Sequence, residues 1–250
     1  RLPINTYRQQ RRGGKGVIAA GKNDEDFVEE ILVANTHDYI LFFTNKGKVH
    51  WQKVYNLPEA SRTARGSAIA NMLQLGKDER IQAYVPVKKF KDGFLFMATS
   101  KGVVKKTALE QFSRPRRGGI IALSLDDDDE LIGVRMTDGK QQMILATRKG
   151  FAARFREADV RAMGRTAHGV RGIRLRQTDK VVSLVVADDN QSLLTVTKKG
   201  FGKQTTVSDY RLIGRGGSGV INMKCTDRNG MIVSVHSVIP GDEVMLISQK

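Results

Sequence analysis

Residues 40–47 read Ile40-Leu41-Phe42-Phe43-Thr44-Asn45-Lys46-Gly47, an apolar run that ends in a basic Lys-Gly turn. The pattern returns with its Lys-Gly step at residues 94–102, 143–150 and 193–200. A fifth copy occupies residues 244–250 and stops at Lys250, where its glycine would follow. The lysines of the five copies are 55, 48, 50 and 51 residues apart. The chain is therefore predicted to consist of repeats of about fifty residues.

A second landmark is a short β-rich run that starts at the same point of each repeat. Its first apolar residues recur every 50 positions, at Ile31, Ile81, Leu131, Val181 and Met231. Several β-branched and aliphatic runs per repeat, separated by Gly, Asn, Asp and Lys turns, favour strands, and no 3.6-residue period persists. The Lys-Gly step suits a hairpin, because its glycine takes a positive φ at little steric cost.

A repeat of about fifty residues with about four strands has the size of one propeller blade. A blade cannot bury its faces alone, so its neighbours must stack on it around a ring or a spiral. We therefore predict an all-β, propeller-like fold of five to six four-stranded blades, with residues 1–250 as a single domain. Both ends fall inside a repeat, which indicates truncation within a blade. Either the partial ends meet to complete one blade, or each belongs to a blade whose remainder is absent.

The composition indicates a polyanionic partner. The chain has 42 Lys and Arg against 26 Asp and Glu, a formal net charge of +16 and a pI near 10.1. Such an excess favours nucleic acid, followed by an anionic membrane or an acidic protein. No apolar run is long enough to cross a bilayer, no signal-peptide core opens the chain, and the lone Cys225 excludes an internal disulfide. These features predict a cytoplasmic domain.

A third repeated landmark locates the charge. Five hexamers, here called the basic boxes, occupy residues 11–16, 61–66, 113–118, 164–169 and 214–219, and each closes on a glycine. Their second-position arginines, 50, 52, 51 and 50 residues apart, are Arg12, Arg62, Arg114, Arg165 and Arg215. The thirty box residues hold ten of the 42 basic side chains and none of the 26 acids. Equivalent positions on a ring or spiral trace one edge, so the boxes predict a curved track of cations.

Such a track suits the backbone of a bent nucleic acid. Guanidinium groups make bidentate contacts with phosphate oxygens, and small Gly, Ala and Ser neighbours let that backbone come close. Nothing in the boxes resembles a dedicated base reader, so their repetition favours recognition of phosphate and shape. Four basic residues that follow the Lys-Gly turns are candidates to flank the track: Lys105, Lys106, Arg154 and Lys203.

The sequence offers no constellation for catalysis, a cofactor or a metal. The first box lacks the Ser or Thr that follows Gly-Lys in a P-loop. His37, His50, His168 and His236 fall at no metal-like spacing, and with Cys225 they give no zinc set. The acidic run at residues 126–130 lacks the spacing of a calcium loop and predicts a solvated turn. Trp51 is predicted to pack rather than to stack on a base. We expect a non-enzymatic domain.

The stretch around the first box carries a family resemblance. Residues Gln10–Gly16 read Gln-Arg-Arg-Gly-Gly-Lys-Gly, the seven-residue signature of the C-terminal domains of bacterial DNA gyrase A. With its fifty-residue repeats, the whole chain resembles the β-pinwheel of that family, a propeller variant in which strands are exchanged between blades. The resemblance implies a domain that wraps double-stranded DNA around its basic edge with a fixed hand and so gives negative supercoiling its direction.

The resemblance also implies roles for individual residues. Gln10 opens the signature, Arg11, Arg12 and Lys15 contact phosphates, and Gly13, Gly14 and Gly16 shape the loop. The weaker boxes extend the track through a further set of arginines, namely Arg62, Arg65, Arg114, Arg116, Arg117, Arg165 and Arg215.

The same resemblance implies the partners of the domain and its location. The partners are the rest of gyrase A, which carries the cleavage tyrosine, and the ATPase subunit, and the location of this A2B2 complex is the bacterial nucleoid. Gyrase pinwheels usually have six blades, so about five repeats indicate a fragment.

Two alternative functions stay open. The first is the pinwheel of topoisomerase IV, a substrate-selection module that generally lacks the intact signature, and the second is a propeller that binds an acidic protein or a small ligand in its central channel.

Overall fold

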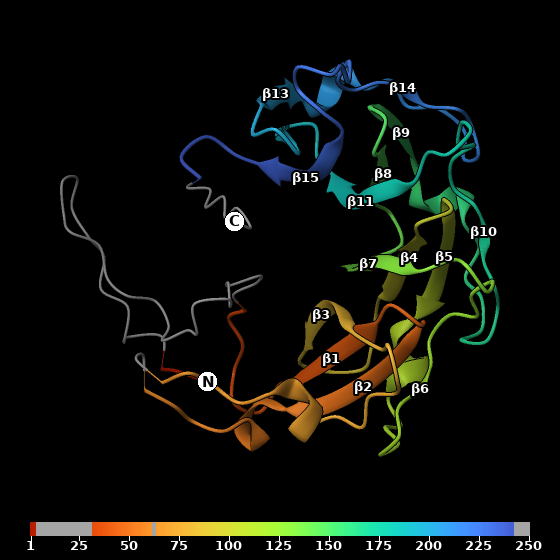
Figure 1. The fold of residues 1–250 in the computed structure, drawn as a ribbon. Coiled ribbons are helices and arrows are strands. Elements are labelled where there is room, and N and C mark those ends of the chain that lie inside the picture. The colour runs from red at the N-terminus through yellow and green to blue at the C-terminus, as the bar shows by residue number, and fades with distance from the viewer. Residues whose placement is uncertain (4–31, 62–63, 243–250) are drawn as a thin grey trace.

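The computed structural model describes residues 1–3, 32–61 and 64–242 (Figure 1). Within these residues the regular structure consists of fifteen strands and of 3-10 turns of three or four residues. The turns are η2 (Val54–Asn56), η3 (Ile69–Asn71), η4 (Leu109–Phe112), η5 (Glu157–Asp159) and η6 (Val207–Asp209). The prediction of an all-β chain is confirmed.

Four antiparallel hairpins form around the repeated Lys-Gly steps. They pair β1 (Tyr39–Thr44) with β2 (Lys48–Lys53), β4 (Phe94–Thr99) with β5 (Val103–Ala108), β8 (Gln142–Thr147) with β9 (Phe151–Arg156), and β12 (Ser192–Thr197) with β13 (Gly202–Thr206). The four turn glycines have φ between +73° and +99°, as predicted. At Gly150 a Cβ would also lie 2.0 Å from the carbonyl oxygen of Met223, so this turn needs glycine for close packing too.

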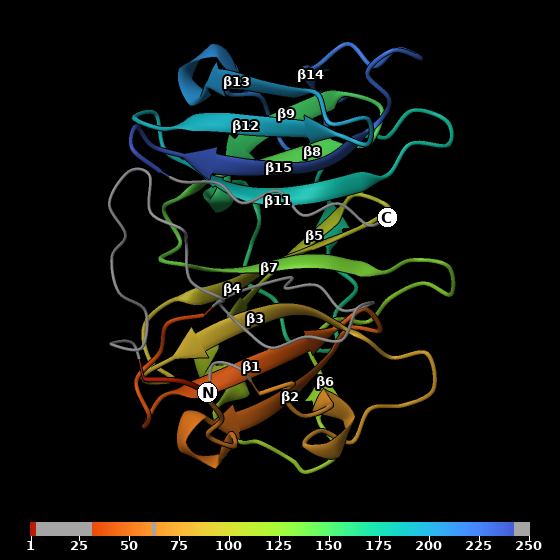
Figure 2. The same ribbon diagram turned by 60° about the vertical axis from the view of Figure 1, so that its left-hand side comes forward.

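A third strand of each repeat lines the inner side of the fold. These inner strands are β3 (Ile81–Val87), β7 (Leu131–Thr137), β11 (Val181–Ala187) and β15 (Ile232–Val238), and each starts within one residue of the second sequence landmark. Each pairs with the first hairpin strand of its own repeat. Figure 2 shows the four inner strands side by side in chain order, and neighbouring strands are in contact.

Each of the first three sheets is completed by the repeat that follows it. Three edge strands of two residues, β6 (Ile120–Ile121), β10 (Val170–Arg171) and β14 (Val220–Ile221), pair with β2, β5 and β9. The sheets are β3-β1-β2-β6, β10-β5-β4-β7, β11-β8-β9-β14 and, in the described residues, β13-β12-β15. We number them blades 1 to 4. This is the exchange of strands between blades that the resemblance implied.

The hydrophobic core lies between neighbouring blades. Between blades 1 and 2, Leu41 and Phe43 of β1 share a buried cluster with Leu95 and Met97 of β4, and equivalent clusters separate blades 2 from 3 and 3 from 4. Because sheets cover both faces of β4 and β8, these strands are buried at five consecutive positions instead of alternating. This explains the apolar runs of the sequence. Figure 1 shows the blades on an arc, with inner strands on the concave side and edge strands on the convex side.

Candidate nucleic-acid interface

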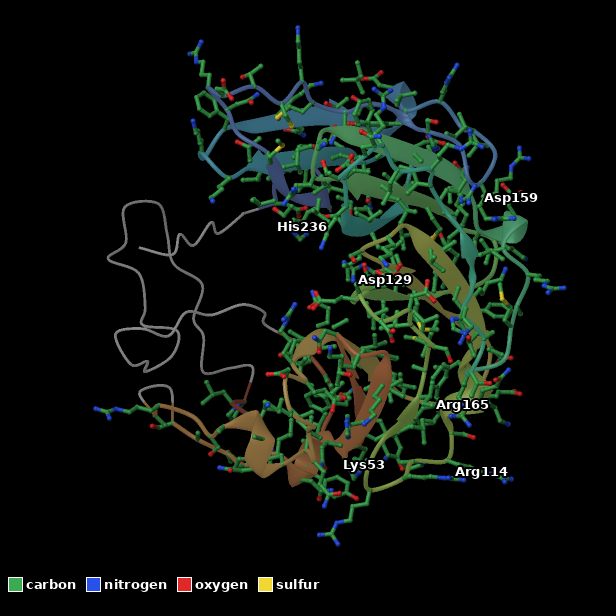
Figure 3. The ribbon with its side chains drawn as sticks, turned by 45° about the vertical axis from the view of Figure 1, so that its right-hand side comes forward. Lys53, Arg114, Asp129, Asp159, Arg165 and His236 are labelled. Carbon is green, nitrogen blue, oxygen red and sulfur yellow. The ribbon has the colours of Figure 1, made fainter. Side chains whose placement is uncertain are left out.

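Three of the basic boxes lie on the convex side of the arc (Figure 1). They are residues 113–118, 164–169 and 214–219, and they lead into the edge strands β6, β10 and β14. We call the three edge strands and these loops the outer edge. In Figure 3, Arg114 and Arg165 lie on the convex side and His236 lies on the concave side. The first box, residues 11–16, the preceding Gln10 of the signature, and Arg62 lie outside the described residues, whereas Arg65 of the second box is described and is exposed.

Two box arginines bond equivalent points of the edge strands. Arg165 Nη1 donates to the carbonyl oxygen of Ile121 at 3.2 Å, and Arg215 Nη1 donates to that of Arg171 at 2.6 Å. Arg215 Nε also donates to the carbonyl oxygen of Asp159 at 3.2 Å. Each of these two boxes therefore holds the edge strand of the blade before it. A guanidinium has five N–H donors, and the described bonds use one at Arg165 and two at Arg215, so both side chains retain capacity for phosphate.

The third box carries the most exposed charge of the described boxes. Arg114, Arg116 and Arg117 are all exposed, and none has an ion-pair partner among residues 1–3, 32–61 and 64–242. Guanidinium groups that are already solvated and unpaired bind phosphate without first breaking a salt bridge.

A glycine closes each box because the edge strand approaches the neighbouring strand closely. Gly169 has φ +100° and Gly219 has φ +72°, and a Cβ at either would lie 2.6 Å from a backbone carbonyl oxygen of β5 or β9. In the third box the residue in this position is Gly119, with φ +74° directly before Ile120, and not Gly118 as the spacing of the boxes predicted. The connection from the 3-10 turn to the edge strand also differs in length, because Gly119 follows Leu109 by 10 residues whereas Gly169 follows Glu157 by 12.

The prediction that Lys105 contacts DNA directly is wrong. Its side chain is completely buried, and Nζ donates to the carbonyl oxygen of Ala122 at 2.7 Å and to that of Arg165. Burial, with a smaller contribution from the charge of Arg165, lowers the pKa of Lys105 from 10.5 to about 7. The amine thus supports two successive loops of the outer edge from beneath.

Lys106 and Arg154, at equivalent positions of β5 and β9, are also buried, so direct contact is wrong for them as well. Lys106 Nζ donates to the carbonyl oxygen of Glu157 at 3.2 Å. Arg154 donates to the carbonyl oxygens of Val207 and Tyr210 and to Asp189 Oδ1. The segment that leads to the next box covers both residues, because the backbone of Lys106 forms an isolated β-bridge with Ala162 and that of Arg154 forms one with Leu212.

Of the four flanking candidates, Lys203 alone is exposed. It lies on β13, and its Nζ donates to the carbonyl oxygen of Asn222 at 3.0 Å. Its placement leaves the ammonium accessible to a phosphate.

Sequence reasoning missed three exposed arginines of the same surface. Arg171 belongs to edge strand β10, and Arg161 and Arg211 adjoin the covering segments at Ala162 and Leu212. Arg161 and Arg211 are 50 residues apart and each stands four positions before a box arginine. The period that revealed the boxes was therefore sufficient to find them.

Other sequence candidates have structural roles. Trp51 packs in the core, as predicted, and its Nε1 donates to the carbonyl oxygen of Phe112 at 2.9 Å. In the acidic run, Asp126, Asp127 and Asp128 are exposed, but Asp129 is buried and accepts from Ser100 Oγ and from the backbone N–H of Lys101. In the described part of the chain, no three His, Cys, Asp or Glu residues gather as a metal site, and no helix is long and apolar enough to cross a membrane.

Comparison with known proteins agrees with this geometry. The family model "DNA gyrase C-terminal domain, beta-propeller" matches residues 1–35, 38–88, 93–138, 141–188 and 191–239, one match per repeat. The A subunit of DNA gyrase from Salmonella typhimurium is 51% identical over 247 residues, which are 98% of this chain and 28% of that protein. The same subunit from Clostridium acetobutylicum is 48% identical over 249 residues, 99% of this chain and 30% of that protein. The chain spans less than a third of the length of these relatives.

Two solved structures share the fold. The crystal structure of the C-terminal domain of DNA topoisomerase IV has a TM-score of 0.79 at 29% identity and covers 88% of this chain and 69% of that chain. The structure of the DNA gyrase A C-terminal domain has a TM-score of 0.73 at 25% identity and covers 94% of this chain and 77% of that chain.

Proposed function

This chain belongs to the family of the DNA gyrase C-terminal domain, and from that premise we propose that it binds double-stranded DNA along its outer edge and wraps it. The observation that carries the proposal is the position of the described boxes. Three successive boxes lie at the same place on three successive blades of an arc. A duplex that follows them must bend around the convex side.

Electrostatics supplies the driving force for this bending. Bending a duplex by 40–90° costs on the order of 1–6 kcal/mol, which favourable interactions along the curve must offset. Each phosphate that a Lys or Arg neutralises releases condensed counterions, so six to ten phosphate contacts would make the affinity fall roughly 10³–10⁵-fold between 50 and 200 mM salt. The exposed arginines of the third box, with Arg65, Arg161, Arg165, Arg171, Arg211, Arg215 and Lys203, supply the described part of this charge.

The proposed role is non-catalytic. We propose that the wrapped segment is presented to the cleavage core in the rest of gyrase A, which works with the ATPase subunit in an A2B2 complex at the bacterial nucleoid. A wrap of fixed hand then gives strand passage its negative direction. Arg11, Arg12 and Lys15 of the signature Gln10–Gly16 are proposed to contact phosphates, together with Arg62 of the second box.

One observation favours a second candidate, the substrate-selection pinwheel of topoisomerase IV. The topoisomerase IV domain is the solved structure with the TM-score of 0.79. The 51% identity to a gyrase relative and the intact heptapeptide support the gyrase role more strongly.

Ligation of nicked circular DNA tests the wrapping proposal with this chain alone. The chain is added to nicked circles at increasing ratios, the nicks are sealed, and the topoisomers are separated after protein removal. We expect a progressive shift of linking number with one sign, because a wrap of fixed hand is trapped on sealing. An unshifted distribution at saturating protein would contradict wrapping.

The signature is tested in the reconstituted enzyme. Replacing Arg11, Arg12 and Lys15 with alanine removes all three charges of the first box. We expect supercoiling to be largely abolished while relaxation is retained, since relaxation does not need a wrap. Supercoiling at the wild-type rate would refute the assignment.

A further inference from the structure

The outer edge presents apolar side chains among its cations. In each edge strand the first residue is half-buried and the second is exposed. The exposed second residues are Ile121, Arg171 and Ile221. Ile121 is 46% exposed and Ile221 is 69% exposed. Single exposed apolar residues are ordinary on protein surfaces, but these two occupy equivalent positions on two blades.

The backbone around these side chains is held firmly. Ile121 pairs with Lys48 across the β2–β6 ladder, and Ile221 pairs with Phe151 across the β9–β14 ladder. The carbonyl oxygen of Ile121 also accepts the bond from Arg165 Nη1. A box guanidinium therefore lies directly beside an exposed isoleucine on a strand that is bonded on both sides.

DNA is the occupant that matches this mixture of charge and apolar surface. A duplex bent around a protein turns its minor groove inward once per helical turn, and architectural proteins contact that groove with arginines and with Ile, Leu, Met, Phe or Pro wedges. Deoxyribose edges offer apolar surface between phosphates. A second copy of this chain fits poorly, because two outer edges would bring like-charged boxes together.

We propose that Ile121 and Ile221 contact deoxyribose and base edges in the minor groove of DNA that the box arginines hold, and so favour the bent duplex. Arg171, at the equivalent position of β10, contacts phosphate instead. This inference rests on the proposed function, and it adds a contact that is not electrostatic.

The test compares charge-neutral and charged substitutions on the same edge. Each of Ile121→Ser and Ile221→Ser should weaken DNA binding about threefold to tenfold, since each removes the burial of one apolar side chain. Both should reduce the bend angle measured by fluorescence transfer between the duplex ends, and the double variant should reduce it further. The slope of log K against log[salt] should not change, because no cation is lost. Arg171→Ala should make that negative slope shallower by about 0.9.

Two controls separate contact from folding. Met136→Ser removes a side chain of the same 46% exposure on inner strand β7 and should leave both affinity and bend unchanged. Ile121→Leu with Ile221→Leu keeps the apolar surface and should retain most of the bend. Loss of bending in the leucine pair as in the serine pair would overturn the inference, as would a serine pair that bends DNA like the wild type.

The outcome also distinguishes this inference from the function on which it rests. If the wild-type chain leaves DNA straight, the proposed function itself fails. If the wild type bends DNA and the serine pair changes only the sedimentation behaviour of the free protein, the isoleucines serve self-association and the inference alone is overturned.

Discussion

Lys105 and Lys203 occupy the same position in blades 2 and 4 but lie in opposite environments. Lys105 of β5 pairs with Met97 and Lys203 of β13 pairs with Thr195, at matching points of their hairpins. Both donate to an equivalent carbonyl oxygen, that of Ala122 or Asn222. Lys105 is nevertheless completely buried, while Lys203 is exposed.

The next repeat causes the difference. In blade 2, edge strand β10 and the box of residues 164–169 lie over β5, and the carbonyl oxygen of Arg165 becomes a second acceptor for Lys105. Among the described residues, no edge strand pairs with β13. The exposure of a cation in this fold thus depends on whether another repeat covers it. Among the described residues, the same residue type is covered by the next repeat in blade 2 and is exposed in blade 4.

The largest expected effect is on stability and separates the two lysines. Lys105→Ala leaves one buried and one partly buried carbonyl oxygen without their donor and opens a cavity, so we expect a loss of about 2–4 kcal/mol in the free energy of unfolding. Lys203→Ala, at an exposed site, should cost less than about 0.5 kcal/mol. Urea unfolding followed by circular dichroism measures both. Equal losses would show that the cover over β5 has no energetic consequence.

The second prediction concerns DNA affinity and concentrates on exposed charge. Replacing Arg114, Arg116 and Arg117 with alanine should make the negative slope of log K against log[salt] shallower by about 2–3, and it should weaken binding at low salt about tenfold or more. Fluorescence anisotropy over a salt series gives both values.

The matched control removes the same number of charges away from the outer edge. Lys88, Lys89 and Lys91 lie in the connection between inner strand β3 and β4, and all three are exposed. Their alanine variant should keep most of the wild-type slope. If both triple variants lower the slope equally, net charge and not its placement drives binding.

The smallest expected effect is a pH dependence of stability that the buried Lys105 contributes. Since the pKa of Lys105 falls from 10.5 to about 7 on folding, the unfolded chain binds a proton between these values that the folded chain does not. The free energy of unfolding therefore rises with pH in this window. Relative to Lys105→Met, the wild type should gain about 1 kcal/mol between pH 7 and pH 8. If the free energy of unfolding of the two proteins changed equally with pH, the lowered pKa of the buried Lys105 amine would be contradicted.

The sequence predicted most of the fold because its period repeats every structural feature. Within residues 32–61 and 64–242, the hairpins and their turn glycines are found where the landmarks placed them, and each inner strand starts at its landmark or one residue later. The copies at Ile31 and at residues 244–250 lie outside the described residues. The partner of each edge strand was harder to predict, because a strand of two residues such as Val170-Arg171 has no sequence feature that shows its pairing with the preceding blade. The Gly118-Gly119 pair likewise permits two registers of the third box, and only the packing against β2 selects Gly119.

The surface position of the box loops could be predicted from the sequence, whereas the burial of the basic residues in the strands could not. Adjacent residues of a strand point to opposite faces, so Lys105 and Lys106 exposed together would require a sheet open on both sides. Both faces of β5 are covered in this fold, one by η5 and the segment after it, and the other by the loops around Ala122 and Arg165. Covering by later repeats depends on contacts across about fifty residues, and composition does not record them.

A DNA-cleavage map tests the central claim that one duplex runs along successive boxes. Cys225 is the only cysteine, so Cys225→Ser gives a background for single cysteines at the box positions Ser113, Thr166 and Ser218. An iron–EDTA cleavage reagent is attached to the cysteine of each variant. Each labelled variant is then mixed with the same end-labelled duplex, on which the protein has a single preferred binding position. The account predicts three separate cleavage sites, ordered along the duplex as the boxes are ordered along the chain. The same reagent at Ser237 of inner strand β15 should cut weakly. Overlapping sites from all three boxes, or equal cleavage from Ser237, would contradict the account.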